Sequence, residues 1–146
     1  KGFTLIEILI SIAVVGIIAA VTISASRSFL KNKTVESAAY EILSALSKAR
    51  SLTLASKNAS KYGVHFDSGS VTIFKGTSFT AGNPENDVIA LYRGARITNI
   101  SLSGGGQDIV FERLSGKSTR SGAVTVSETG GGGSRLVNIY KTGLAE

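Results

Sequence analysis

FTLIEILISIAVVGIIAAVTI, residues 3–23, is the stretch that decides the fold of this chain. Glu7 is its only ionisable side chain, and Gly16 is its only glycine. The hydrocarbon core of a bilayer is about 30 Å thick, and roughly 20 apolar residues in a helix cross it. A backbone amide without a partner is costly in hydrocarbon, and a single segment avoids this cost only by forming a helix. The stretch therefore predicts a transmembrane helix.

Glu7 needs an explanation in such a helix. A carboxylate at the centre of a membrane costs at least about 2.5 kcal/mol, so an acid there usually has a partner and a role. One alternative is that Glu7 lies near the helix end and only reaches the interface. Lys1-Gly2 stands directly before the apolar stretch and favours a role. This order is typical of a charged leader that is cut off ahead of the apolar part, whereas an ordinary secretory signal loses its apolar part.

Residues 1–7, Lys-Gly-Phe-Thr-Leu-Ile-Glu, followed by an apolar helix resemble the N-terminus of type IV pilins and of type II secretion pseudopilins. The resemblance implies that a prepilin peptidase cuts between Gly2 and Phe3 and that the new amine of Phe3 is methylated. It also implies that Glu7 pairs with the Phe3 amine of a neighbouring subunit during fibre assembly. A buried charge is tolerable once an opposite charge meets it. Residues 1–2 would then be the remnant of a leader peptide.

The resemblance also implies partners and a location. The partners are other pilin or pseudopilin subunits, an inner-membrane assembly platform and membrane lipid. The chain would be a single-pass protein of the inner (cytoplasmic) membrane, with its head in the periplasm or outside the cell, and would then enter a pilus or pseudopilus. Charge does not settle the orientation, because Lys1 precedes the helix while Arg27, Lys31 and Lys33 follow it, and basic residues usually mark the cytoplasmic side.

The composition of the 146 residues excludes several classes of function. The chain has no Cys, which excludes disulfides and cysteine-based catalysis. A single His argues against the common histidine-rich zinc or iron sites. We therefore predict no metal and no cofactor. The net charge of +6 permits contact with anionic lipid or nucleic acid but does not demand it.

The helix is expected to continue beyond the apolar stretch. Residues 24–33 contain neither Pro nor Gly, so nothing there breaks a helix, although pilins often carry a proline about where Ser24 stands. Apolar residues then recur at spacings of three and four and form one stripe of an amphipathic helix: Val35, Ala39, Ile42, Leu46 and Ala49. We predict one helix from about Phe3 to Ala55, with its first half in lipid or a fibre core and its second half under a head.

After Lys61 the sequence has the period of strands. Short β-branched or aromatic segments alternate with Gly- and Ser-rich turns, and they predict strands at 62–66, 71–75, 88–92, 97–102, 109–113, 123–127 and 136–140. Asp67-Ser68-Gly69-Ser70 is typical of a hairpin turn. No further helices alternate with these strands, which argues against an α/β enzyme architecture.

The predicted fold class is therefore α+β. A long N-terminal helix, transmembrane in its first half and amphipathic in its second, packs on a small antiparallel head of one or two sheets, and the resemblance makes this a pilin fold. The predicted division is a leader remnant at 1–2, a transmembrane and assembly helix at 3–30, and a globular head at 31–146. The head contains the amphipathic helix 31–56 and the β-rich region 62–146.

The order of these parts is similar to the branch of pseudopilin H and of DNA-uptake minor pilins. The features that carry this looser resemblance are Ala49-Arg50-Ser51, Gly63-Val64, and Val110-Phe111-Glu112-Arg113 with Gly116. The resemblance covers residues 1–30 strongly and the rest of the chain weakly.

The other motifs do not indicate a phosphate-binding or catalytic site. Gly116-Lys117-Ser118 imitates the end of a phosphate-binding loop, but position 111 is Phe where the loop needs Gly, and no helix is expected to follow. His65 lies within an expected strand with no acid or nucleophile evident beside it, so a structural histidine is favoured over a catalytic one. The glycine runs 104–106 and 130–133 are typical of flexible turns.

DNA binding is the main functional alternative. Basic side chains in the C-terminal third could contact phosphates: Lys117, Arg120, Arg135 and Lys141. DNA-uptake members of the resembling branch carry an arginine-bearing glycine motif near the C-terminus. Here the corresponding end, residues 142–146, reads TGLAE and has an acid and no arginine.

Three functional classes follow. The first is a structural subunit, a minor pilin or pseudopilin of a type IV pilus or type II secretion pseudopilus. The second is a module that presents a DNA- or surface-binding head. The third is a membrane-tethered enzyme, for which the sequence has no supporting constellation, so we expect no enzymatic activity. Glu7 favours the first two classes, because a simple tether has no use for a carboxylate at that depth.

Overall fold

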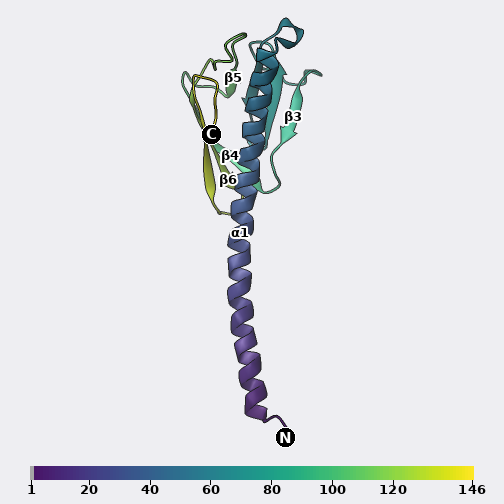
Figure 1. Cartoon of the computed structure of the whole chain (residues 1–146), viewed down its shortest axis with the longest axis vertical. Coiled ribbons are helices and arrows are strands. Elements are labelled where there is room, and N and C mark those ends of the chain that lie inside the picture. Colours follow the sequence, from purple (N-terminus) through teal and green to yellow (C-terminus); the bar gives the residue numbers. More distant parts are fainter. Residues whose placement is uncertain (1) are drawn as a thin grey trace.

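A computed structural model describes residues 2–146, apart from the side chains of residues 22–31. Lys1, the first residue of the expected leader remnant, lies outside this part. The chain is one long helix that carries a β-rich head at the end opposite the N-terminus (Figure 1). The α+β prediction is confirmed: an N-terminal helix is followed by small antiparallel sheets, which is consistent with a pilin fold.

The helix α1 (Leu5–Leu54) has 50 residues. Its bounds include position 24, where pilins often carry proline, and also the expected boundary between residues 30 and 31. The side chains at both of these places lie outside the described part, and the division into 3–30 and 31–146 stays a prediction. The helix ends where expected, with Ala55 as its C-cap, and a short 3₁₀ turn, η1 (Lys57–Ala59), leads into the head.

The described residues form seven strands, one for each predicted segment. In chain order they are β1 (Tyr62–Phe66), β2 (Ser70–Lys75), β3 (Asp87–Ala90), β4 (Ala95–Leu102), β5 (Asp108–Val110), β6 (Gly122–Glu128) and β7 (Ser134–Ile139). They make one sheet of order β3-β2-β1-β5 and another of order β4-β6-β7. Each pair is antiparallel. The strand predicted at 109–113 is shorter, because Phe111 makes only an isolated bridge with Ser118 and the chain then turns.

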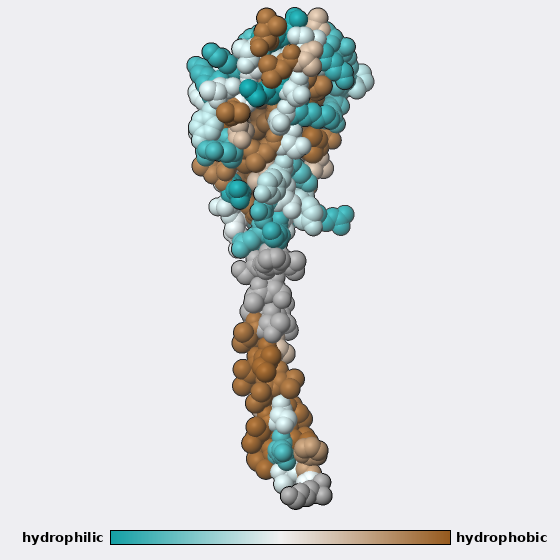
Figure 2. Space-filling view, viewed as in Figure 1, coloured by the Kyte–Doolittle hydropathy of each residue, from teal (hydrophilic) through white to brown (hydrophobic). Residues whose placement is uncertain are grey.

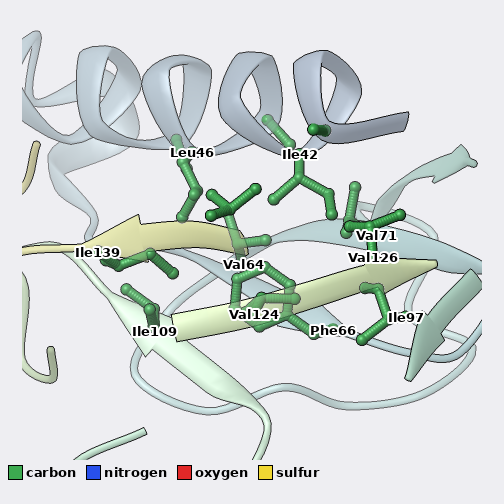
Figure 3. Packing of buried hydrophobic residues seen from close by; sticks show 14 of the residues in the cluster. Ile42, Leu46, Val64, Phe66, Val71, Ile97, Ile109, Val124, Val126 and Ile139 are labelled. Atoms are coloured by element: carbon green, nitrogen blue, oxygen red, sulfur yellow. The ribbon is translucent and has the colours of Figure 1, made fainter. Parts of the chain in front are cut away.

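The core of the head lies between α1 and the two sheets. The apolar stripe predicted from Val35 to Ala49 is buried, with each of its five residues no more than 3% exposed. Figure 3 shows Ile42 and Leu46 pointing from the helix toward the strands. Val64 of β1, in the four-stranded sheet, and Val124 of β6, in the three-stranded sheet, belong to the same buried cluster. Each sheet therefore covers part of one helix face, and the head is held together through the helix.

Outside the head the surface of α1 is different. The space-filling view shows apolar side chains around the N-terminal part of the helix, whereas polar side chains cover much of the head (Figure 2). In the part of the chain that the structure describes, no helix is both long enough and apolar enough to cross a membrane.

Candidate functional site

The N-terminal segment has a defined start to its helix. Thr4 is the N-cap, with extended backbone angles of φ −83° and ψ 151°. Its side-chain oxygen accepts a hydrogen bond from the Glu7 amide at 3.3 Å, and its carbonyl accepts from the amides of Glu7 and Ile8 at 3.1 and 3.3 Å. These bonds satisfy amides that have no partner inside the helix. Gly2 and Phe3 therefore precede the helix.

Glu7 lies in the first turn of α1. A helix N-terminus favours negative charge, because the peptide dipoles leave a partial positive charge there. Thr4 and Glu7 have the spacing of a capping box, in which the acid also bonds back to the N-cap amide. Only the Thr4 half of the box is made: among the described contacts, the Glu7 carboxylate has no hydrogen bond and no ion pair. The side chains that the structure describes therefore leave this carboxylate available for a partner.

The side chains around Glu7 are apolar and exposed. Phe3 is 81% exposed and Leu5 is 78% exposed. Large apolar side chains continue along the helix as far as Val21, each at least 48% exposed. Soluble monomers rarely expose contiguous apolar surface on this scale, and such surface marks a site for protein or lipid contact. The segment thus combines an apolar surface with one carboxylate that has no partner among the described residues.

Sequence reasoning missed Thr4 as a site residue. The signal was present, because a threonine three positions before a glutamate at the start of an apolar run is the signature of a capping box. Ser11 lies one turn beyond Glu7, and its hydroxyl donates to the Glu7 carbonyl at 2.7 Å. This bond lies within the helix and leaves the carboxylate of Glu7 untouched.

Two of the four candidate DNA-contacting residues lie together. Lys117 and Lys141 line one groove of about 590 Å³. The backbone joins their segments, since the Ser118 amide donates to the Lys141 carbonyl at 3.1 Å. Glu112 lines the same groove, and its carboxylate is 2.6 Å from the ammonium group of Lys61. This groove therefore has two lysines and an acid whose charge Lys61 offsets.

The side chain of Arg120 makes hydrogen bonds within the head. Its guanidinium donates to the Gly105 carbonyl at 2.6 Å and to the Asp108 carbonyl at 3.4 Å. These bonds tie the glycine turn to the strand that follows it. A guanidinium held in this way has fewer donors left for a phosphate.

Arg135 lies at another part of the head. It lines a groove with Asn32 and Glu36 of α1. The pKa of Glu36 is lowered first by the hydrogen bond and charge of Lys33, and Arg135 adds a further attraction. The segment of Lys141 lies instead near Arg50, which is 14 residues beyond Glu36, or roughly 21 Å at 1.5 Å per residue. The four basic residues do not form one patch.

His65 has an acidic neighbour that the sequence did not reveal. Its Nδ1 lies 2.6 Å from Oδ1 of Asp108, and its ring stacks on Phe79 with centroids 3.9 Å apart. The pairing of β1 with β5 places His65 opposite Asp108 although they are 43 residues apart. The expectation that His65 has no acid beside it is wrong. Among the described contacts no hydroxyl group is bonded to this ring, so the arrangement lacks a nucleophile.

The described residues contain no group of three or more His, Asp or Glu side chains that could hold a metal ion. The N-terminal segment is therefore the candidate site that the structure supports best.

Comparison with known proteins identifies the same segment. A family model described as the prokaryotic N-terminal methylation motif matches residues 1–23. No curated protein and no solved structure matches the chain. The match confirms the N-terminal part of the resemblance and supports a type IV pilin-like or pseudopilin subunit, which a prepilin peptidase processes and which assembles with other pilin subunits. It covers Gly2, Phe3, Thr4 and Glu7. The similarity to the branch of pseudopilin H stays a prediction.

Proposed function

We propose that this chain is a minor pilin or pseudopilin, a structural subunit that enters a type IV pilus or a type II secretion pseudopilus through its N-terminal helix. The observation that carries the proposal is that, within the methylation motif, an exposed apolar helix surface surrounds a carboxylate that has no partner among the described residues. The subunit is not an enzyme in this proposal. Its head presents a surface, and its helix assembles.

The proposal includes two environments for residues 3–23. Before assembly the segment crosses the inner membrane in this proposal, and the head lies on the far side. The support is the sequence of residues 3–23, of which the side chains at 22 and 23 lie outside the described part in which no spanning helix is found. The inner-membrane assembly platform then moves the subunit from lipid into the fibre. Both environments are apolar, so the same exposed side chains stay out of water throughout.

Glu7 provides the specific contact in the fibre. Cleavage between Gly2 and Phe3 leaves a new amine on Phe3, which is then methylated and stays a cation. The Glu7 carboxylate of a neighbouring subunit meets this amine. The pair is strong because the low dielectric of an apolar core strengthens the attraction, and because an unpaired charge there is strongly destabilising.

The test of this role is Glu7→Ala in cells that assemble the fibre. We expect the variant to reach the membrane with a folded head but to be missing from sheared filaments. Ser11→Ala is the matched control, since it removes a polar group one turn away without changing a charge. Entry of Glu7→Ala into filaments at the level of the wild type would remove the role assigned to Glu7.

DNA binding is a second candidate function, favoured by one observation. Lys117 and Lys141 line the same groove of about 590 Å³, so two cations could meet one phosphate backbone. In this alternative the chain is a DNA-binding minor pilin for DNA uptake, with the same N-terminal assembly helix.

A gel-shift assay of the detergent-solubilised chain over a range of salt concentrations tests this alternative. Binding that weakens steeply with salt, and that Lys117→Ala and Lys141→Ala each reduce, would support it. Arg135→Ala is the control, because Arg135 lies away from the groove. The absence of any shift at low salt would remove the alternative and leave the structural subunit.

A further inference from the structure

Thr4 is the N-cap of α1. It has extended backbone angles, and its hydroxyl oxygen accepts the Glu7 amide at 3.3 Å. Residues 2–4 consequently lie outside the helix, which starts at Leu5. The bond expected to be cut, between Gly2 and Phe3, is separated from the first helical residue by Thr4 alone.

A peptide bond in a helix is a poor protease substrate. Its carbonyl and amide are hydrogen-bonded along the helix, and its backbone must unwind before an active site can align it for attack. Proteolysis concentrates accordingly in exposed backbone outside regular structure. Gly2 and Phe3 meet this condition, since both are exposed and neither belongs to α1.

The sequence beyond Thr4 does not by itself keep the helix away from this bond. Alanine is the best helix former and a poor N-cap, whereas glycine is an acceptable N-cap. Replacing Thr4 with alanine would therefore favour a helix that starts at Phe3 with Gly2 as its cap. The apolar surroundings strengthen this tendency, because amides without partners are costly there.

We propose that Thr4 is a positioning residue for leader removal, because its cap holds the Gly2–Phe3 bond in extended backbone ahead of the helix. This inference rests on the proposed function, in which a prepilin peptidase cuts that bond. Thr4 does not take part in the reaction. Thr4 controls the fraction of molecules in which the Gly2–Phe3 peptide bond lies in extended backbone, the form that the peptidase can accept.

This role has a specific kinetic signature. When only a fraction of the substrate is competent, its apparent affinity falls by that fraction, whereas the chemical step in the bound complex is unchanged. Loss of a typical N-cap changes the populations about fivefold. The extended form is the one seen in the wild type, so a fivefold shift of this equilibrium lowers its fraction by less than fivefold. Thr4→Ala should therefore raise KM about twofold, and at most about fivefold, and leave kcat near its original value.

The experiment uses the chain preceded by a prepilin leader, in detergent micelles, with a purified prepilin peptidase. Cleavage is followed by mass spectrometry at several substrate concentrations. The variants are Thr4→Ala, Thr4→Ser and Ser11→Ala, with Gly2→Leu as a test of the cleavage site itself. The Cα chemical shift of Phe3 reports the backbone: helical in Thr4→Ala, and extended in the wild type and in Thr4→Ser.

We expect Thr4→Ser to restore the KM of the wild type, because serine caps as well as threonine, and Ser11→Ala to have no effect. Equal KM values for Thr4→Ala and the wild type would overturn the inference. So would a KM for Thr4→Ser as high as that of Thr4→Ala, since the cap would then not be the cause. If Gly2→Leu is still cut before Phe3, the proposed processing itself fails, whatever Thr4 does.

Discussion

Asp108 accepts a hydrogen bond from His65 across the pairing of β1 with β5, with Oδ1 and Nδ1 2.6 Å apart. The two side chains are partly exposed, at 34% and 17% respectively. The ring of His65 also stacks on Phe79, which belongs to the loop between β2 and β3. The pair, together with the stacked ring of Phe79, therefore links the edge of the larger sheet to the loop between β2 and β3.

Asp108→Ala should lower the free energy of unfolding by about 1 kcal/mol, because His65 loses its hydrogen-bond partner in a half-buried place. Denaturant unfolding of the detergent-solubilised chain, followed by circular dichroism, measures this. Glu85→Ala is the control: it breaks the more exposed pair with Lys75 and should cost less than about 0.5 kcal/mol. Additive effects of Asp108→Ala and His65→Ala in a double-mutant cycle would contradict the link.

Gly143→Ala should destabilise the head strongly. A Cβ at this position would lie 1.9 Å from the Gly116 carbonyl oxygen, and the backbone φ is +83°. Gly131→Ala separates the two causes, since Gly131 has φ +76° but nothing within 4 Å of its would-be Cβ. We expect about 1 kcal/mol for the backbone effect alone and at least about 2 kcal/mol more at Gly143. Equal losses at both positions would show that Gly143 and Gly116 are not in close contact.

Thr53 connects the end of α1 to β1. It is fully buried, its hydroxyl donates to the Ala49 carbonyl at 2.9 Å, and its oxygen accepts the Tyr62 amide at 3.0 Å. Thr53→Val keeps the shape but leaves the Tyr62 amide without an acceptor, which should cost about 1–3 kcal/mol. Thr53→Ser keeps both bonds and loses one methyl group, so it should cost less. Calorimetric melting of the two variants measures the difference in stability. If Thr53→Val were more stable than Thr53→Ser, the hydrogen bond between Thr53 and the Tyr62 amide would be refuted.

Tyr140 should titrate above the ordinary range of a tyrosine, because its pKa is raised by Glu146. The Tyr140 hydroxyl donates to Oε1 of Glu146, and this hydrogen bond, followed by the negative charge, raises the pKa of Tyr140 above its ordinary value of 10.0. Glu146→Gln removes the charge, so the pKa of Tyr140 should fall toward that value. NMR titration of the labelled ring measures the shift, and an unchanged pKa in the variant would contradict the pairing.

The same shift predicts how stability depends on pH. A raised pKa means that the folded chain holds the Tyr140 proton more tightly than the unfolded chain. The contribution of the pair is fully present below the pKa of the unfolded tyrosine, about 10, and is lost as pH rises through the folded value. In alkaline solution the wild type should therefore lose the stability that this pair contributes, and Glu146→Gln should lose less over the same pH range.

Local features were predictable because local spacing determines them. The helix stripe from Val35 to Ala49 follows from a period that any amphipathic helix shows, and all five residues are buried as predicted. Strand positions were also predictable, since β-branched segments between glycine-rich turns mark them. The methylation motif around Gly2 and Phe3 is contiguous, so no folding was needed to find it, and cleavage between these two residues stays a prediction.

The partners of these segments could not be predicted. The sequence does not reveal that β1 pairs with both β2 and β5. The contact between His65 and Asp108 could therefore not be predicted, because it depends on the pairing of β1 with β5. The sequence also could not show which of the four candidate DNA-contacting residues lie together, and the structure separates Arg135 from Lys117 and Lys141. Strand order and register depend on contacts between residues far apart in the chain. A periodic sequence pattern indicates that a segment forms a strand, but it does not indicate which other strand that segment pairs with.

The sequence by itself determined an apolar helix with one acid and a junction before it, because hydrophobic length, charge and motif are properties of consecutive residues. The Thr4 cap had a signal in the sequence, but only the tertiary structure showed that the Glu7 carboxylate has no partner among the described residues. It alone decided which strands cover the buried stripe. The physical reason is that hydrogen-bond satisfaction and burial belong to atoms in space, and the fold brings those atoms together.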